Sequence, residues 1–124
     1  HVSILATNGR FLKAAGKELS ILKSAVELDT QALDVPRMMQ GSENATYVQA
    51  FGKDERRWCE VSPLHHVAEG KDIPPFLLVV ADDREQKIEQ ATAFQKALQG
   101  LQQTKCPYPQ DLGLEWTSVD LRQG

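Results

Sequence analysis

The longest apolar run of the chain extends from Phe76 to Ala81, after Pro74-Pro75 and before Asp82-Asp83. Its residues favour strands, and no polar residue interrupts them. This pattern predicts a strand buried on both faces, as parallel strands between helices are. A shorter, mostly apolar run over residues 23–28, closed by Asp29, predicts an earlier buried strand.

The spacing of apolar residues becomes helical after Asp83. Apolar positions at steps of three and four predict an amphipathic helix from residue 84 to about 101. These positions are Ile88, Ala91, Phe94, Leu98 and Leu101. Shorter helices are predicted over residues 1–8 and 10–15, because Asn8-Gly9 and Gly16 are typical helix ends. Residues 114–121 are predicted to form a third strand.

The middle of the chain, residues 30–73, is polar and is interrupted by proline and glycine. Short helices are expected there over residues 45–51 and 54–61. A region of this length without strands is usually functional, so we expect it to form a cap or loop region. Strands joined by helices predict an α/β fold with a mainly parallel sheet and right-handed crossovers. Three strands make a thin sheet, which favours residues 1–124 being one portion of a larger domain.

Composition and charge exclude several classes of protein. Hydrophobic residues make up 41% and charged residues 25% of the chain, as in an ordinary globular domain rather than a disordered or coiled-coil chain. The net charge is −3 with scattered Lys and Arg, which argues against nucleic-acid binding. No apolar run approaches the roughly 20 residues of a membrane span. Neither a G-x-G-x-x-G nor a Walker phosphate loop is present, so no nucleotide cofactor is expected.

The two cysteines, Cys59 and Cys106, are too few and too far apart to indicate a disulfide framework or a metal site. We expect free thiols in a reducing compartment, which slightly favours a cytoplasmic protein. No metal cofactor is expected.

Several short phrases follow one another in an order that resembles a known family. They are residues 1–7 (HVSILAT), 19–23 leading into 26–29, 34–36 (DVP), 47–52, 62–64 (SPL), 73–78 (IPPFLL) and 90–98 (QATAFQKAL). Together they resemble the esterase and lipase branch of the α/β-hydrolases, in its carboxylesterase and arylformamidase-like members. The resemblance covers residue 1 to about 101. It implies that the chain is the C-terminal portion of a single α/β-hydrolase domain.

The resemblance also implies where the catalytic groups lie. The family's nucleophilic serine occupies a G-x-S-x-G turn, and this chain has no such motif. His1 resembles a residue a few places after that turn, so the nucleophile is expected upstream of His1. The histidine base is expected after the last strand, but no histidine follows Leu121 before Gly124. The chain by itself is therefore expected to be inactive.

The family's catalytic acid follows the strand that corresponds to residues 76–81, so the candidates are Asp82 and Asp83. Asp83 fits better, because relatives carry a Gln at the spacing that separates Asp83 from Gln90. The carboxylate would hold the histidine tautomer and stabilise the imidazolium. Alternatively, both aspartates cap the following helix and interact with its positive end. Relatives carry His-Gly where this chain has only apolar residues, a departure from the family pattern.

Other polar and aromatic residues are assigned less specific roles. His65 and His66 are expected in a solvated loop rather than as a base or metal ligands, since adjacent side chains diverge. Five large side chains of the middle region are expected to be core residues, because such residues are more often part of a core than of a substrate pocket. They are Met38, Met39, Tyr47, Phe51 and Trp58.

The resemblance predicts that the parent protein cleaves a small carboxylic ester, or a related amide, through an acyl-enzyme. The alternative is a non-catalytic hydrolase-like protein that uses the fold for binding or assembly. A nucleotide-binding α/β domain is disfavoured, because both phosphate-binding motifs are absent.

Overall fold

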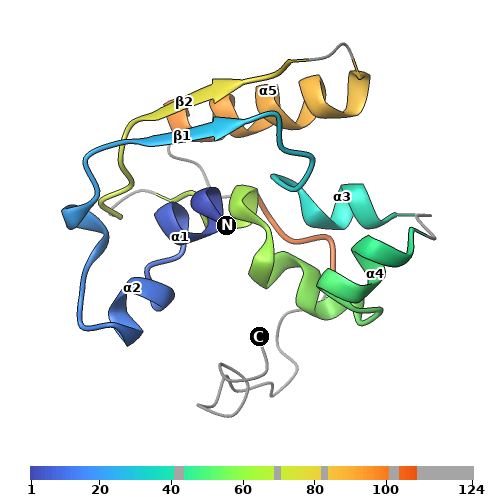
Figure 1. Ribbon diagram of the computed structural model, residues 1–124, viewed down its shortest axis with the longest axis horizontal. Coiled ribbons are helices and arrows are strands. Elements are labelled where there is room, and N and C mark those ends of the chain that lie inside the picture. Colours follow the sequence, from blue (N-terminus) through green and yellow to red (C-terminus); the bar gives the residue numbers. More distant parts are fainter. Residues whose placement is uncertain (41–43, 69–70, 82–83, 101–103, 109–124) are drawn as a thin grey trace.

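Two short parallel strands, β1 (Ala25–Leu28) and β2 (Phe76–Val79), form the sheet at the top of Figure 1. The computed structural model describes residues 1–40, 44–68, 71–81, 84–100 and 104–108. The strands pair in register, from Ala25 opposite Phe76 to Leu28 opposite Val79. The described residues therefore form a mixed fold of helices and a small parallel sheet, as the sequence predicts. The predicted third strand, residues 114–121, lies outside them.

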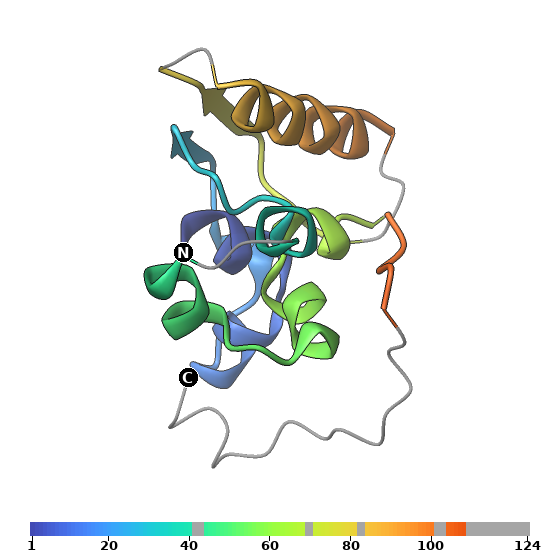
Figure 2. The same ribbon diagram turned by 90° about the vertical axis from the view of Figure 1, so that its right-hand side faces the viewer.

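The two faces of the sheet differ in exposure. Val26 and Leu28 of β1 are 48% and 67% exposed, and Leu77 and Val79 of β2 are 59% and 40% exposed. The register places these four side chains on one face. The prediction of burial on both faces is therefore wrong for the described residues. Figure 2 shows the reason, since the helices that cover the sheet lie on the opposite face.

The helices at the start of the chain follow the prediction closely. α1 (Val2–Thr7) ends at Asn8, and α2 (Arg10–Ala14) ends just before Gly16, whose φ of 75° is a conformation that glycine readily adopts. Ser3 of α1 is buried and donates its hydroxyl hydrogen to the Glu27 carboxylate of β1. α1 therefore packs on the inner face of the sheet.

The long helix α5 (Glu85–Gly100) confirms the predicted amphipathic helix, but its buried stripe differs from the apolar one. Phe94 is fully buried, as expected, and its ring contacts that of Phe76 edge-on at 5.1 Å between centroids. Ile88, however, is 45% exposed, whereas Lys87 and Gln90 are buried. Specific polar partners of these two side chains, described below, decide this rotation of the helix.

One apolar core lies between the sheet, α5 and the short 3₁₀ helix η3 (Pro63–His66). Its buried members are Leu33, Leu64, Val67, Phe94 and Ala97, and Phe76 and Leu78 of β2 pack against them. This core fixes α5 and the middle of the chain against the inner face of the sheet.

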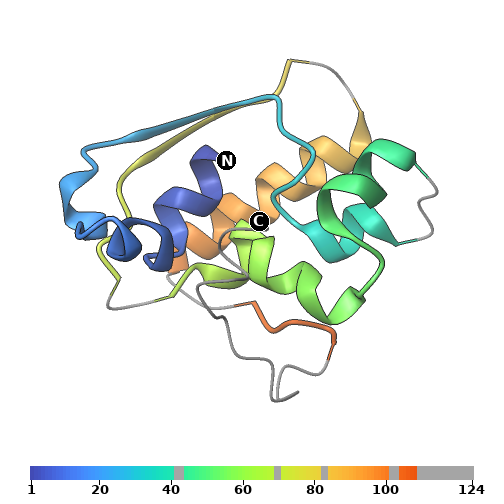
Figure 3. The ribbon, with the colours of Figure 1, turned by 60° about the horizontal axis from the view of Figure 1, so that its bottom comes forward.

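The described residues of the middle of the chain form a second helical unit without strands. It contains α3 (Val35–Met39), α4 (Ala45–Phe51) and the 3₁₀ helix η2 (Glu55–Val61), which match the helices predicted over residues 45–51 and 54–61. Asp34, Asn44 and Asp54 cap these three helices by accepting backbone hydrogen bonds. Figure 3 shows α3 and α4 at the opposite end of the molecule from α2 and the 3₁₀ helix η1 (Leu19–Ile21).

The large side chains of this region form a second core. Val35, Met38, Met39 and Trp58 are buried together, and Tyr47 and Phe51 pack against them. The expectation that these residues are core residues is confirmed.

Cys59 of η2 and Cys106 form a disulfide, with their Cα atoms 5.8 Å apart. The expectation of free thiols is therefore wrong. Two cysteines separated by 47 positions give no local signal of pairing, because the return of the chain from α5 to η2 brings them together. Next to the bridge, the ring of Tyr108 packs edge-on against Trp58 at 5.8 Å between centroids. The bridge thus attaches the segment after α5 to the second core.

Reduction of this disulfide is expected to lower the free energy of unfolding by about 2–4 kcal/mol, because the bridge closes a long loop in the unfolded chain. Urea denaturation with and without dithiothreitol measures the change. The double variant Cys59→Ala/Cys106→Ala is the matched control and should not respond to the reductant. An unchanged urea midpoint of the wild-type chain would show that the two thiols are not joined.

Candidate functional site

The carboxyl ends of β1 and β2 lie together at one end of the sheet, because the strands are parallel. In α/β sheets, ligands and catalytic groups are usually found at this end. β1 is followed by Asp29, whose backbone N–H donates to the Val79 carbonyl at the end of β2 (2.6 Å). Asp29 has a φ of 57°, a left-handed conformation that Asp tolerates better than most residues. This backbone turn directs its side chain across the end of the sheet.

The Asp29 carboxylate joins three segments. One oxygen, Oδ1, accepts the N–H of Ala81 at 3.1 Å, just after β2. The other, Oδ2, accepts a hydrogen bond from Lys87 Nζ at 3.0 Å, in the first turns of α5. The Lys87 side chain is only 7% exposed, so solvent screens this ion pair little. Asp29 thus holds the end of β1, the residues after β2 and α5 in a fixed arrangement.

The two candidate acids, Asp82 and Asp83, lie outside the described residues. Their sequence neighbours on both sides are described: the N–H of Ala81 donates to Asp29, and α5 starts at Glu85. From the sequence, Asp29 was expected only to end the first strand. The position of Asp29 directly after a parallel strand was the available signal that it would meet the segment carrying the candidate acids.

Gln90 has a structural role at the centre of the fold. It is 1% exposed, and its Oε1 accepts the backbone N–H groups of Leu33 and Asp34 at 3.1 and 3.0 Å. Its Nε2 has no hydrogen-bond partner among the described residues. The side chain therefore fixes α5 against the start of α3. The family resemblance used Gln90 only as a marker for the acid.

Ser62 and His65 form a buried pair that superficially resembles a nucleophile and its base. Ser62 Oγ accepts the Val35 N–H at 3.1 Å and donates to the Leu33 carbonyl at 3.2 Å, and it lies 2.8 Å from His65 Nδ1. A hydroxyl has one hydrogen, and that of Ser62 is donated to the Leu33 carbonyl. The hydrogen between Ser62 Oγ and His65 Nδ1 is therefore assigned to His65 Nδ1. Ser62 is fully buried and has no further hydrogen-bonding capacity, so the pair is structural.

The expectation that His65 and His66 lie in a solvated loop is wrong. Both belong to η3; His65 is buried, and His66 donates from Nε2 to the Glu60 carbonyl at 2.7 Å. Burial lowers the pKa of His65, and the nearby Asp34 carboxylate opposes this shift. Burial also lowers the pKa of His66, and the positive charge of Lys71 adds to the effect. Local packing, rather than sequence adjacency, decided their environment.

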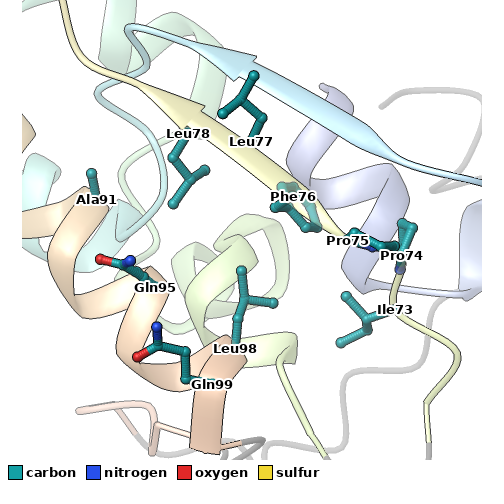
Figure 4. Close-up of a pocket in the computed structure, with 10 residues that line it drawn as sticks. All are labelled: Ile73, Pro74, Pro75, Phe76, Leu77, Leu78, Ala91, Gln95, Leu98 and Gln99. Atoms are coloured by element: carbon teal, nitrogen blue, oxygen red, sulfur yellow. The ribbon is translucent and has the colours of Figure 1, made fainter.

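An apolar groove of about 650 Å³ lies elsewhere on the molecule, between β2 and α5 (Figure 4). Its walls include Pro75, Phe76 and Leu78 on the side of β2, and Gln95 and Leu98 on the side of α5. The groove extends to the prolines before β2, so it is distinct from the strand ends at Asp29.

Within the described ranges, no group of three His, Cys, Asp or Glu side chains is arranged to hold a metal ion. In the same part of the chain, no helix has the length and apolar character needed to cross a bilayer.

Comparisons of the chain with protein-family models, with characterised proteins and with solved structures found no match. The α/β arrangement therefore rests on the structure itself, and the family resemblance stays a prediction.

Asp29→Asn is expected to lower the free energy of unfolding by about 2–3 kcal/mol, because Lys87 loses a carboxylate partner in a buried position. The double variant Asp29→Asn/Lys87→Met should regain part of this loss, since it removes the buried cation as well. Urea denaturation measures both values. Glu89→Gln is the matched control, because its ion pair with Arg37 is exposed and should contribute less than about 1 kcal/mol. Equal effects of Asp29→Asn and Glu89→Gln would contradict the assigned role.

The free energy of unfolding is expected to fall as the pH drops from about 7 to about 5.5. His65 and His66 have folded-state pKa values below the usual 6.5, so in this range the unfolded chain binds more protons than the folded chain. His66→Gln should weaken the pH dependence, because an amide can still donate to the Glu60 carbonyl but does not titrate. The exposed His1→Gln serves as the control. Urea midpoints at several pH values measure the slope, and a slope that His66→Gln leaves unchanged argues against the assignment.

Proposed function

We propose that this chain is part of a serine hydrolase that cleaves small carboxylic esters or related amides through an acyl-enzyme. The observation that carries the proposal is the parallel pair β1–β2 followed by α5, with Asp29 fixing the position where the segment containing Asp82 and Asp83 begins. A parallel sheet that presents carboxylates at its carboxyl end suits the acid of a catalytic triad.

In this proposal Asp83 is the catalytic acid, and Asp82 is the alternative. The serine of a G-x-S-x-G turn upstream of His1 attacks the ester carbonyl while a histidine takes its proton. The histidine then protonates the departing alcohol, and water repeats the sequence to release the carboxylic acid. The carboxylate of Asp83 orients the histidine and stabilises its protonated form. The Asp29–Lys87 pair contributes by fixing the carboxyl ends of both strands against α5.

The interaction between Asp29 and Ala81 supports an acid in this place. A catalytic carboxylate must be held in a fixed geometry, and hydrogen bonds from neighbouring residues supply that constraint. Asp29 provides one such bond two residues before Asp83. Solvated helix-capping aspartates need no comparable constraint at the strand end.

Asp83→Asn in the longer protein that contains this chain is expected to reduce kcat/KM for p-nitrophenyl acetate by about 10³- to 10⁴-fold, because the histidine loses its orienting carboxylate. Asp82→Asn is the matched control and should retain most of the activity. The measurement is steady-state hydrolysis, followed by the absorbance of the released p-nitrophenolate at about 400 nm. Circular dichroism establishes that both variants fold.

Three outcomes are distinguished. Loss of activity only in Asp83→Asn supports the proposal, and loss only in Asp82→Asn moves the role of the acid to that residue. Full activity in both variants refutes a catalytic acid after β2.

A non-catalytic hydrolase-like protein is the second candidate. It is favoured by the structural use of Ser62 and His65, whose hydrogen bonds hold the fold rather than a substrate. A fluorophosphonate probe separates the two candidates, because it labels an activated serine covalently. Labelling of the longer protein supports the hydrolase, and an unlabelled, folded protein supports the binding function.

A further inference from the structure

The disulfide between Cys59 and Cys106 joins a buried residue to a segment at the surface. Cys59 of η2 is 3% exposed, whereas Cys106 is half-buried and lies between the exposed residues Lys105 and Pro107. The segment of residues 104–108, orange in Figure 3, runs beside η2. A thiol from solution can therefore approach the sulfur of Cys106 from the surface, whereas packing closes the approach to the sulfur of Cys59.

The same segment covers part of the second core. The ring of Tyr108 contacts that of Trp58 edge-on and packs against the buried cluster that contains Met38 and Met39. Trp58 is also held from within the core, because its Nε1 donates to the Gly52 carbonyl at 3.1 Å. These inner contacts do not involve the bridge. Trp58 and the core around it can therefore keep their positions when the segment moves away.

We propose that the Cys59–Cys106 bridge is a redox-sensitive latch that thiol reductants open in the folded protein. Reduction releases residues 104–108 from η2 and uncovers the ring of Trp58, and oxidation returns the segment to the second core. Disulfides that are exposed at the surface exchange with thiols more readily than bridges buried within a core. The latch does not depend on the proposed hydrolase activity.

Opening of the latch follows thiol–disulfide exchange with a dithiol. One thiolate of the dithiol attacks Cys106 Sγ, the Sγ–Sγ bond breaks, and Cys59 leaves with the electron pair and takes up a proton. The second thiolate of the dithiol then attacks the dithiol's own sulfur in the mixed disulfide. This step releases Cys106 as a thiolate, which takes up the second proton. The dithiol is oxidised to a cyclic disulfide, and its two electrons reduce the bridge.

Two neighbours of Cys106 favour this route. The backbone N–H of Tyr108 donates to Cys106 Sγ at 3.4 Å, which stabilises negative charge on that sulfur when it leaves the mixed disulfide. Lys105 is adjacent in the chain and exposed, so its positive charge attracts thiolates, and negatively charged thiols most strongly. The surroundings of the bridge thus favour attack at Cys106 and the departure of its thiolate.

Reduction of the full 124-residue chain without denaturant tests the latch. The substitution Trp116→Phe leaves Trp58 as the only tryptophan, so its fluorescence reports on the segment. The reduction rate should rise about tenfold for a tenfold rise in dithiothreitol, without a plateau. The emission maximum of Trp58 should shift to longer wavelength while the far-UV circular dichroism stays unchanged. Cys106→Ala on the same background is the matched open form and should show the shifted emission without reductant.

Glutathione, a negatively charged thiol, identifies the sulfur that is attacked. Acid quenching followed by peptide mass spectrometry should find glutathione on Cys106 and a free thiol on Cys59. Lys105→Glu should slow the reaction with glutathione by about threefold or more relative to that with cysteamine, which is positively charged. Lys13→Glu, an exposed substitution in α2, is the matched control and should leave this ratio unchanged.

A reduction rate that reaches a plateau with increasing dithiothreitol would overturn the proposal, because unfolding would then limit access to the bridge. Loss of the circular dichroism signal on reduction would also overturn it, and so would an unchanged Trp58 emission in the folded, reduced chain. Glutathione on Cys59 would contradict attack at Cys106, on which the latch depends.

Discussion

The hydrogen bonds of Asp29 hold together the part of the molecule where both strands end. Its backbone N–H bonds Val79, and its carboxylate bonds Ala81 and Lys87, so the ends of β1 and β2 and the start of α5 share a single anchoring residue. Because Lys87 is buried, its charge requires a nearby carboxylate, and this requirement makes the arrangement specific. The strained φ of Asp29 is the local cost of this geometry.

Buried polar side chains also join distant segments in the core. Gln90 bonds the backbone of Leu33 and Asp34, and Ser62 bonds the backbone of Leu33 and Val35. Both side chains thus meet at the segment that leads into α3, where backbone groups would otherwise be buried without partners. The apolar contacts of Phe94 and Leu33 add cohesion around these bonds. The middle region is therefore fixed to the sheet by polar bonds as well as by hydrophobic packing.

The described sheet is covered on one face and open on the other, with an additional open edge along β2. These features bear on the proposed function, because a catalytic acid at the end of β2 needs a well-ordered strand beneath it. The four exposed apolar side chains of the sheet, which include Leu28 and Leu77, make up an apolar face of the kind that contacts another layer of structure.

The sequence by itself determined the local elements. The apolar runs gave the positions of both strands, and helical spacing with its end signals gave α1, α2, α4 and α5 nearly to the residue. The aromatic and Met residues of the middle region were correctly expected in a core. These features depend on neighbours within a few positions, so local propensity and periodicity suffice to predict them.

Tertiary structure alone decided the exposed face of the sheet, the burial of His65, the Cys59–Cys106 bridge and the rotation of α5 that buries Lys87 and Gln90 in place of Ile88. Each depends on a partner distant in sequence, such as Asp29 for Lys87, 58 positions away. The sequence shows how apolar each residue is. The hydrogen-bond or ion-pair partner of a buried charge or amide, however, is determined only when distant segments pack together in the fold.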